Sequence, residues 1–412
     1  MAFLFFLLYL TVIYLRPGEW VPGLAGWQLL DITTIGTAFF LALQAALTKR
    51  GLVRVPHNRM MLGLFAAILA SHLVHTYVSG FAGALVGFSK TVIMYFLVVN
   101  ALNSPRKMQV TLWLLAGLTL LMALQGIEQA KTGVGLAGQG LSGDGRITWV
   151  GIFEDPNDLA LAFVIVVPIL LGYLFGPAFF AFKWILAFPM GILLYGTYLT
   201  NSRGGVLALM VAVAFFFIKR SRWRVVGGMV GGLLAAAVFA FGPSRLGMLS
   251  ADEDSAAGRL DAWYYGFQLL KHNPVFGVGQ NMFTEDYPRT AHNSFVLAFA
   301  ELGLVGFFFW VGLLYVTFKG LSLVQKQDAK LASYAYGLQA GLVGFSTAAF
   351  FLSRTYIMMP YLLAGLSAAL FNIARAETQA LAFSFTGKDL RNVALLCFGV
   401  LALLQVGMKL WL

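Results

Sequence analysis

Long apolar segments separated by short polar breaks run along the whole chain. They give thirteen candidate spans, at residues 2–15, 28–48, 60–79, 82–101, 109–128, 157–175, 183–200, 204–218, 225–241, 294–318, 332–352, 357–374 and 391–410. About 20 apolar residues in a helix cross about 30 Å of hydrocarbon. The pattern therefore predicts an all-α fold, a polytopic integral membrane helical bundle of about 12–13 transmembrane helices.

Composition excludes the soluble classes of protein. Of the 412 residues, 59% are hydrophobic and 11% are charged, and the mean hydropathy is +0.81. No soluble domain fits between the spans, so we expect a single membrane domain over residues 1–412. The first apolar segment lacks a basic leader and a small-residue cleavage site, which indicates a retained span rather than a signal peptide. The single cysteine, Cys397, forms no intrachain disulfide and carries no information on redox compartment.

The distribution of charge predicts the topology. With the amino terminus in the cytoplasm, the inner connections hold 17 Lys and Arg against three acids, whereas the outer connections hold ten against fourteen. This asymmetry follows the positive-inside rule. The net charge of +11 is then a topology signal and an affinity for anionic membrane lipids, and no nucleic-acid partner is expected. We interpret the basic run at 219–224 as an anchor beside a span rather than a nucleic-acid patch.

Two outer connections are long, at residues 129–156 and 242–293. Connections beyond about 15 residues are usually functional or disordered. The second is rich in aromatic residues, which argues against disorder, so we expect a large structured loop over the bundle. Within it, residues 259–272 place apolar side chains at helical spacing and predict an amphipathic helix at the membrane surface.

Three outer residues form a candidate catalytic set: His292, Arg203 and Arg259. Histidine accepts protons near neutral pH, and the planar guanidinium of arginine matches phosphate oxygens. Together they suit displacement of a diphosphate leaving group by a hydroxyl. The alternatives are a helix-capping His292–Asn293 pair, a tight turn with a membrane-surface charge at Arg203, and an ordinary loop arginine at Arg259.

Other polar residues carry weaker signals. Lys90 lies near the middle of the fourth span, where a charge costs roughly 2.5–3.5 kcal/mol, so it should face an anionic headgroup, an aqueous cavity or a structural partner. His72 and His75 share a helix face without further ligands and favour structural roles. Residues 252–254 have the D-x-D pattern with which many nucleotide-sugar enzymes hold a metal ion. Their predicted outer location argues against this role, because nucleotide sugars are cytoplasmic. Asp155 and Pro156 are explained by a helix start.

One region of the sequence resembles a known family. Residues 273–283, NPVFGVGQNMF, and 291–306, AHNSFVLAFAELGLVG, look like the signature region of the bacterial O-antigen ligase and O-antigen polymerase superfamily. The spacing H-N-x9-G-x-x-G, which begins at His292 and ends at Gly306, is that associated with the ligases. Arg203 and Leu207 fit the arginine-x3-leucine element that accompanies it.

The resemblance implies a function and roles for these residues. It implies a bacterial inner-membrane enzyme, multi-pass, with its active site facing the periplasm. His292 would be the general base, and Arg203 and Arg259 would contact the diphosphate. Asn293 and Arg289 are added as substrate-binding residues from their position beside the set, and Lys90 as a headgroup contact.

The expected reaction is transfer of a glycan en bloc from a polyprenyl-diphosphate carrier to an acceptor sugar hydroxyl. The resemblance favours an O-antigen ligase with a lipid A core acceptor, using no metal or other cofactor, and direct displacement predicts inversion at the anomeric carbon. One alternative is a polymerase that joins carrier-linked repeat units. Another is a flippase or transporter of lipid-linked glycans, which the near absence of charge within the spans disfavours. An inactive scaffold is a further alternative.

Overall fold

The computed structural model describes the chain except residues 50, 178–182, 221–255, 327–328, 379–380 and 412. Its described residues form thirteen α-helices and no strand. In chain order these are α1 (Ala2–Leu15), α2 (Leu29–Thr48), α3 (Pro56–Leu73), α4 (Val78–Ala101), α5 (Pro105–Thr132), α6 (Pro156–Leu174), α7 (Ala187–Leu199), α8 (Arg203–Lys219), α10 (Ala256–His272), α11 (Ser294–Val324), α12 (Ala329–Ala349), α13 (Met358–Glu377) and α14 (Gly387–Trp411). Four short 3-10 helices complete them: η1 (Pro17–Glu19), η2 (Pro22–Leu24), η3 (Gly151–Phe153) and η4 (Lys183–Leu186).

The helical bundle predicted from the apolar pattern is confirmed, with local corrections. The third span ends early, at Leu73, because the chain turns through Thr76 in the left-handed region before α4 starts. The 129–156 loop starts later than predicted, because α5 continues to Thr132 and ends at Gly133 with φ 83°. The predicted span at 225–241 lies outside the described residues.

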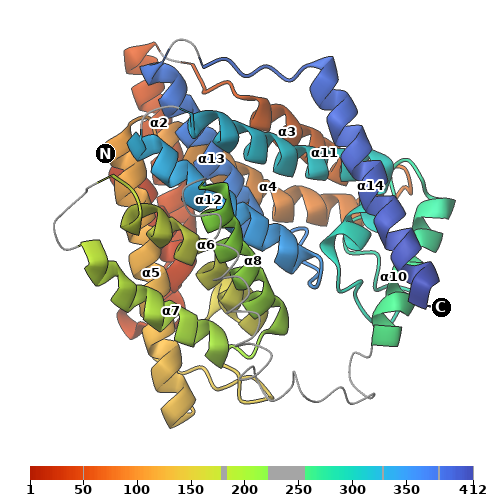
Figure 1. The fold of residues 1–412 in the computed structure, drawn as a ribbon, viewed down its shortest axis with the longest axis horizontal. Coiled ribbons are helices and arrows are strands. Elements are labelled where there is room, and N and C mark those ends of the chain that lie inside the picture. The colour runs from red at the N-terminus through yellow and green to blue at the C-terminus, as the bar shows by residue number, and fades with distance from the viewer. Residues whose placement is uncertain (50, 178–182, 221–255, 327–328, 379–380, 412) are drawn as a thin grey trace.

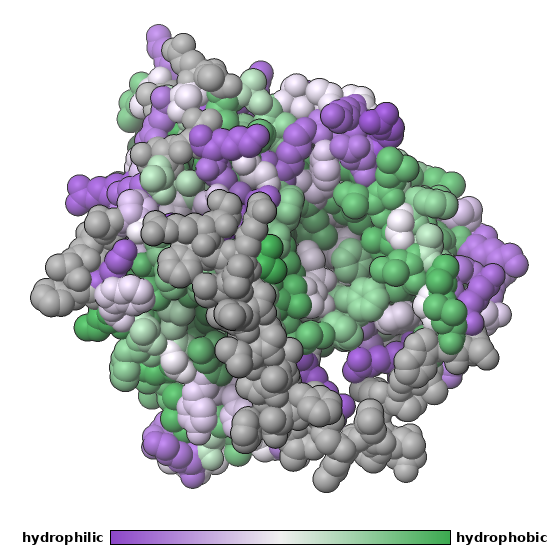
Figure 2. Space-filling view, viewed as in Figure 1, coloured by the Kyte–Doolittle hydropathy of each residue, from purple (hydrophilic) through white to green (hydrophobic). Residues whose placement is uncertain are grey.

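Six of the described helices, α2, α4, α5, α6, α11 and α14, are long and apolar enough to cross a membrane. Of the most hydrophobic 18-residue segment of α6, 94% is buried, whereas the corresponding shares in α2 and α14 are 11% and 22%. Apolar side chains that face outward from a bundle need lipid rather than water around them. Figure 2 shows broad apolar surfaces with hydrophilic residues mostly toward the margins. The chain is therefore a multi-pass membrane protein with α6 at its centre.

The helix α11 is broken at Gly303, whose backbone has φ 62° and ψ −168°. The break frees backbone groups, and the segment before α11 pairs with them. Gly279 N donates to Glu301 O at 2.9 Å, and Leu304 N donates to Pro274 O at 2.8 Å. A β-carbon on Gly303 would lie 2.4 Å from the carbonyl carbon of Val275. Glycine is thus required at the first glycine of the G-x-x-G element by both its φ and this close approach.

The long connection predicted at 242–293 is structured over its described residues, 256–293. The amphipathic helix predicted over 259–272 is confirmed as α10, which packs on α11 and reaches α14 (Figure 1). The connections from α2 to α3 and from α13 to α14 run along the top of the view, away from α10. The connections between helices thus lie at two opposite ends of the bundle, and α10 and the turn before α11 lie at the same end.

Candidate active site

The turn before α11 is held on the connection between α12 and α13. The Ser294 hydroxyl donates to Leu352 O at 2.6 Å and accepts from Arg354 N at 2.7 Å. The Thr290 hydroxyl donates to Ser353 Oγ at 2.8 Å. These bonds fix the turn that carries His292 against residues 350–355, which we call the α12–α13 loop.

His292 is half-buried within this turn, in the left-handed region with φ 48°. Its neighbours are fixed on both sides. Trp263 Nε1 of α10 donates to Ala291 O at 3.1 Å, and the Asn293 side chain accepts from Phe295 N at 2.9 Å as the N-cap of α11. The capping interpretation therefore holds for Asn293, while His292 lies outside the helix and is held in place by the residues around it.

Arg203 is the exposed first residue of α8. Ser202 caps this helix by accepting from Gly205 N at 3.1 Å, and its hydroxyl donates to Asn157 Oδ1 at 2.7 Å. A β-carbon on Gly204 would lie 3.5 Å from Phe351 Cβ, so the start of α8 packs against the α12–α13 loop. The amino end of a helix carries partial positive charge and favours anions, to which Arg203 adds a full charge.

Arg259 lies one helical turn before Trp263 on α10, so the two side chains share a face. The Trp263 ring packs on Phe350 of the α12–α13 loop with centroids 5.5 Å apart. The Arg259 Nε is buried and has no hydrogen-bond partner among the described residues. All three predicted catalytic residues thus lie on segments that contact one loop.

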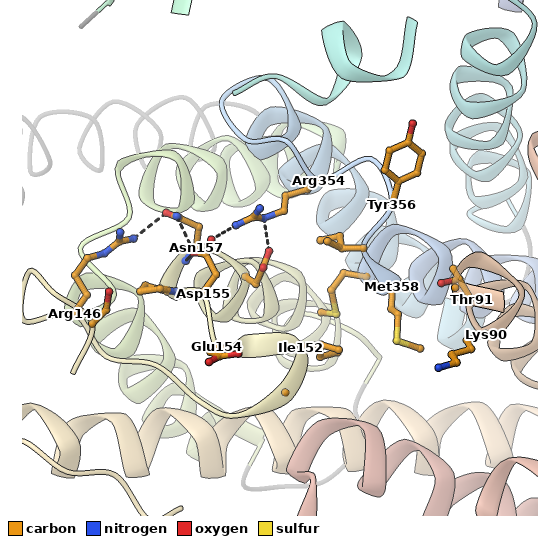
Figure 3. Close-up of a pocket in the computed structure, with 17 residues that line it drawn as sticks. Lys90, Thr91, Arg146, Ile152, Glu154, Asp155, Asn157, Arg354, Tyr356 and Met358 are labelled. Carbon is orange, nitrogen blue, oxygen red and sulfur yellow. Dashed lines mark hydrogen bonds and ion pairs between the residues drawn. The ribbon is translucent and has the colours of Figure 1, made fainter. Parts of the chain in front are cut away.

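A cavity of about 880 Å³ lies beside this loop (Figure 3). Its charged lining residues are Lys90, Arg146, Glu154, Asp155, Asp158 and Arg354. Of the site residues predicted from the sequence, only Lys90 lines it. His292, Arg203, Arg259, Asn293 and Arg289 do not, and Arg289 is exposed.

Arg354 of the α12–α13 loop forms ion pairs with Asp155 and Asp158 at the start of α6, the latter with Nε and Oδ1 2.5 Å apart. The side chains of Arg354 and Asp158 are 19% and 12% exposed. Asp155 is also the N-cap, since its carboxylate accepts from Asn157 N at 2.7 Å. The helix-start interpretation of Asp155 is confirmed, but it missed the ion pair. The sequence signal for this ion pair is Arg354 itself, which lies in the short break between the predicted spans 332–352 and 357–374.

Arg146, from the loop before α6, lines the cavity and also forms a hydrogen bond with the residues just before α8. It donates through Nε to Thr200 O at 2.7 Å and through Nη2 to Asn157 Oδ1 at 2.9 Å. Asn157 Oδ1 therefore accepts from both Arg146 and Ser202, the residue before Arg203. Arg146 was not singled out from the sequence, because only the fold brings its loop to α8.

Lys90 lies at the opposite end of the cavity from Arg146, on α4 (Figure 3). It is exposed and forms no ion pair with any described residue. Tyr356 also lines the cavity, and burial holds its pKa well above the ordinary value.

The histidines of α3 and the turn after it support the broken helix. His75 Nε2 lies 2.8 Å from Gly277 O, in the segment that pairs with α11. In the same segment, a β-carbon on Gly279 would lie 3.0 Å from His72 Nδ1. Within the described ranges, no group of three or more His, Cys, Asp or Glu is placed to hold a metal ion. The D-x-D segment at 252–254 lies outside those ranges.

Comparison with known proteins identifies the region that carries these residues. A family model described as O-antigen ligase matches residues 188–311, which include Arg203, Arg259 and His292. No curated protein matches the chain. A solved chain, described under "Structural coordination of polymerization and crosslinking by a peptidoglycan synthase complex", is similar with a TM-score of 0.45 and 20% identity, covering 77% of this chain and 98% of that chain. The resemblance predicted from the sequence is confirmed, because the O-antigen ligase family model matches this chain over residues 188–311.

Proposed function

We propose that the protein is a membrane glycan transferase of the O-antigen ligase type. It moves a glycan en bloc from a polyprenyl-diphosphate carrier to an acceptor sugar hydroxyl at the periplasmic face of a bacterial inner membrane. The observation that carries the proposal is that His292, Arg203 and Arg259 come from three segments packed on one loop, and that Arg354 of this loop lines a polar cavity.

The proposed reaction is a direct displacement at the anomeric carbon. The imidazole of His292 accepts the proton of the acceptor hydroxyl as its oxygen attacks. The bond between the anomeric carbon and the phosphate oxygen breaks, and the electron pair leaves with the diphosphate. Arg203 and Arg259 stabilise the charge that grows on that leaving group. A single displacement inverts the anomeric configuration and requires no metal ion.

The remaining predicted residues extend this site. The positive amino end of α8 and the guanidinium of the half-buried Arg259 supply the cationic side needed by a diphosphate. Lys90, exposed in the cavity, would meet an anionic headgroup. Asn293 and Arg289, beside His292, would contact the substrate. The acceptor that we favour is a lipid A core sugar.

His292→Asn tests the role of the base. Asparagine tolerates the positive φ at this position, so the fold should persist, but its amide accepts no proton. We expect transfer from purified lipid-linked glycan to fall by about 10²–10⁴-fold, the usual contribution of a general base. The matched control is His272→Asn, since His272 is an exposed residue at the end of α10. Equal rates for His292→Asn and the natural protein would refute the assignment.

Two further measurements test the class of reaction: incubation with donor alone, and transfer in the presence of EDTA. With donor alone, a ligase leaves the chain length unchanged, whereas a polymerase lengthens it. EDTA should leave the rate unchanged, and loss of transfer on chelation would contradict the metal-free mechanism. A protein that moves donor across the bilayer without forming a glycosidic bond would be a transporter instead.

A further inference from the structure

A second cavity, of about 390 Å³, adjoins the first. The two share three lining residues: Ser142, Gly151 and Glu154. The rest of the second lining comes from Glu19 and from residues 139–141 and 148–150. The two cavities therefore border on the same residues, and a ligand that occupied both would lie along Glu154.

The two cavities differ in charge. The first has Lys90, Arg146 and Arg354 in its lining beside three carboxylates, whereas the lining of the second, among the described residues, contains carboxylates but no lysine or arginine. The second offers two carboxylates, from Glu19, which pairs with Arg16 at 3.1 Å, and from Glu154, together with amide and hydroxyl groups. Such acceptor groups suit a ligand rich in hydroxyl donors, and the Glu154 carboxylate, which has no ion-pair partner among the described residues, repels a phosphate or carboxylate.

The groups at the junction are available to a ligand. Neither the Glu154 carboxylate nor the Ser142 hydroxyl forms a side-chain hydrogen bond or ion pair with any described residue, and Glu154 is exposed. Figure 3 shows the contrast, since the ion pairs of Arg354 reach Asp155 and Asp158 but not Glu154. Two unoccupied polar groups at one opening match the paired hydroxyls of a sugar.

The walls of the second cavity are held in place without a ligand. Gln129 of α5 donates to Gly140 O at 2.8 Å and accepts from Thr148 N at 2.9 Å. Trp149 is fully buried, and its Nε1 donates to Tyr14 O of α1 at 2.8 Å. Ligand sites are usually preformed in this way, because a fixed wall spares the ordering cost of binding.

We propose that the second cavity is a glycan subsite, which binds uncharged sugar residues of the substrate chain while the carrier's diphosphate stays on the cationic side. This proposal rests on the proposed function, because it assigns a place to the glycan that the transfer reaction moves. The Glu154 carboxylate accepts hydrogen bonds from sugar hydroxyls at the junction, and Ser142 provides a second contact there.

Gly140→Trp is the variant that tests the subsite. Gly140 lines the second cavity, and a β-carbon there meets no atom within 4 Å, so the indole has room to enter and fill the space. Gly143→Trp is the matched control, since it has the same open surroundings in the same loop but lines neither cavity. Neither glycine has a positive φ, so the backbone tolerates both substitutions.

The substrates are lipid-linked glycan purified from the cells that make the protein, and the same lipid trimmed to its first sugar. We expect Gly140→Trp to lower kcat/KM for the full donor by about tenfold, mainly through KM, as expected when a few sugar contacts are lost. Transfer from the trimmed donor should be unchanged, and Gly143→Trp should resemble the natural protein with both. The free glycan released from the lipid should bind the natural protein and bind Gly140→Trp about tenfold more weakly.

The outcomes separate the subsite from the function. The subsite alone is overturned if the natural protein transfers glycan and Gly140→Trp lowers kcat/KM equally for both donors. It is also overturned if Gly140→Trp leaves kcat/KM unchanged for both donors. Absence of transfer by the natural protein refutes the proposed function, and binding of the free glycan then still decides whether the cavity takes sugars. A loss that follows the length of the acceptor instead of the donor assigns the same subsite to the acceptor chain.

Discussion

Single residues in this site act mainly by holding elements together. Arg354 pairs with Asp155 and Asp158 and thereby fixes the α12–α13 loop on the start of α6. That loop in turn binds Ser294 and so sets the position of the turn with His292. Replacing one partner of a buried ion pair leaves the other charge without compensation, which is more costly than losing the pair together.

Arg354→Ala should therefore lower the free energy of unfolding by about 3–5 kcal/mol, the range for breaking a buried pair. Adding Asp158→Asn removes the more buried of the two charges that Arg354→Ala leaves without a partner, so the double variant should be more stable than the sum of the two single effects by at least about 1 kcal/mol. The measurement is thermal unfolding of the purified variants in detergent. Simple additivity would show that Arg354 and Asp158 are not coupled.

At the scale of elements, the broken helix α11 decides the shape of the site. The segment before it pairs with the backbone freed at Gly303, and the Glu301 carboxylate accepts from Phe283 N at 3.1 Å. In a membrane, backbone groups left without partners cost several kcal/mol each, so this pairing is what makes the break tolerable. It also brings the signature segment 273–283 alongside the helix that His292 precedes.

Gly303→Ala should destabilise the protein by at least about 2 kcal/mol, because it combines a strained φ with a steric clash against Val275. Gly399→Ala in α14 is the control. Gly399 has open space around it and lies within a regular helix, so alanine should be neutral or raise stability by about 0.5–1 kcal/mol. Thermal unfolding checks both, and similar stabilities would contradict the role given to Gly303.

At the scale of the whole molecule, the sidedness of the bundle decides where any chemistry takes place. The asymmetry of lysine and arginine predicts that the loop after α5 faces the periplasm and that the loop after α2 faces the cytoplasm. Both cavities take lining residues from the loop after α5. The proposed site is periplasmic only if that prediction holds.

Cysteine labelling in spheroplasts tests the orientation. The native Cys397 is buried and should give little background. Gly143→Cys in the outer loop should react with a membrane-impermeant maleimide in intact spheroplasts, whereas Gly51→Cys in the loop after α2 should react only after lysis. Both glycines have open space for the new side chain. The reverse pattern of labelling would place the cavities in the cytoplasm and sink the proposed function.

Much of the fold follows from the order of residues. Apolar segments of fixed length predict α1, α2 and α6 to within a residue or two of their observed ends. The break at Gly303 is different, because nothing in an apolar run such as 294–318 marks a kink. Its cause is the approach of Val275, a contact between segments that the periodicity of one segment cannot reveal.

The sequence by itself determined the membrane class, the helix caps at Asp155 and Asn293, and the resemblance of the signature region to the O-antigen ligase family, because each depends on local patterns of residues. Only the tertiary structure decided that Arg354 meets Asp155, that Arg146 reaches the start of α8, and that two cavities share Glu154. These are contacts between segments far apart in the chain. They arise because the helices must bury polar groups against one another where lipid offers no hydrogen bonds.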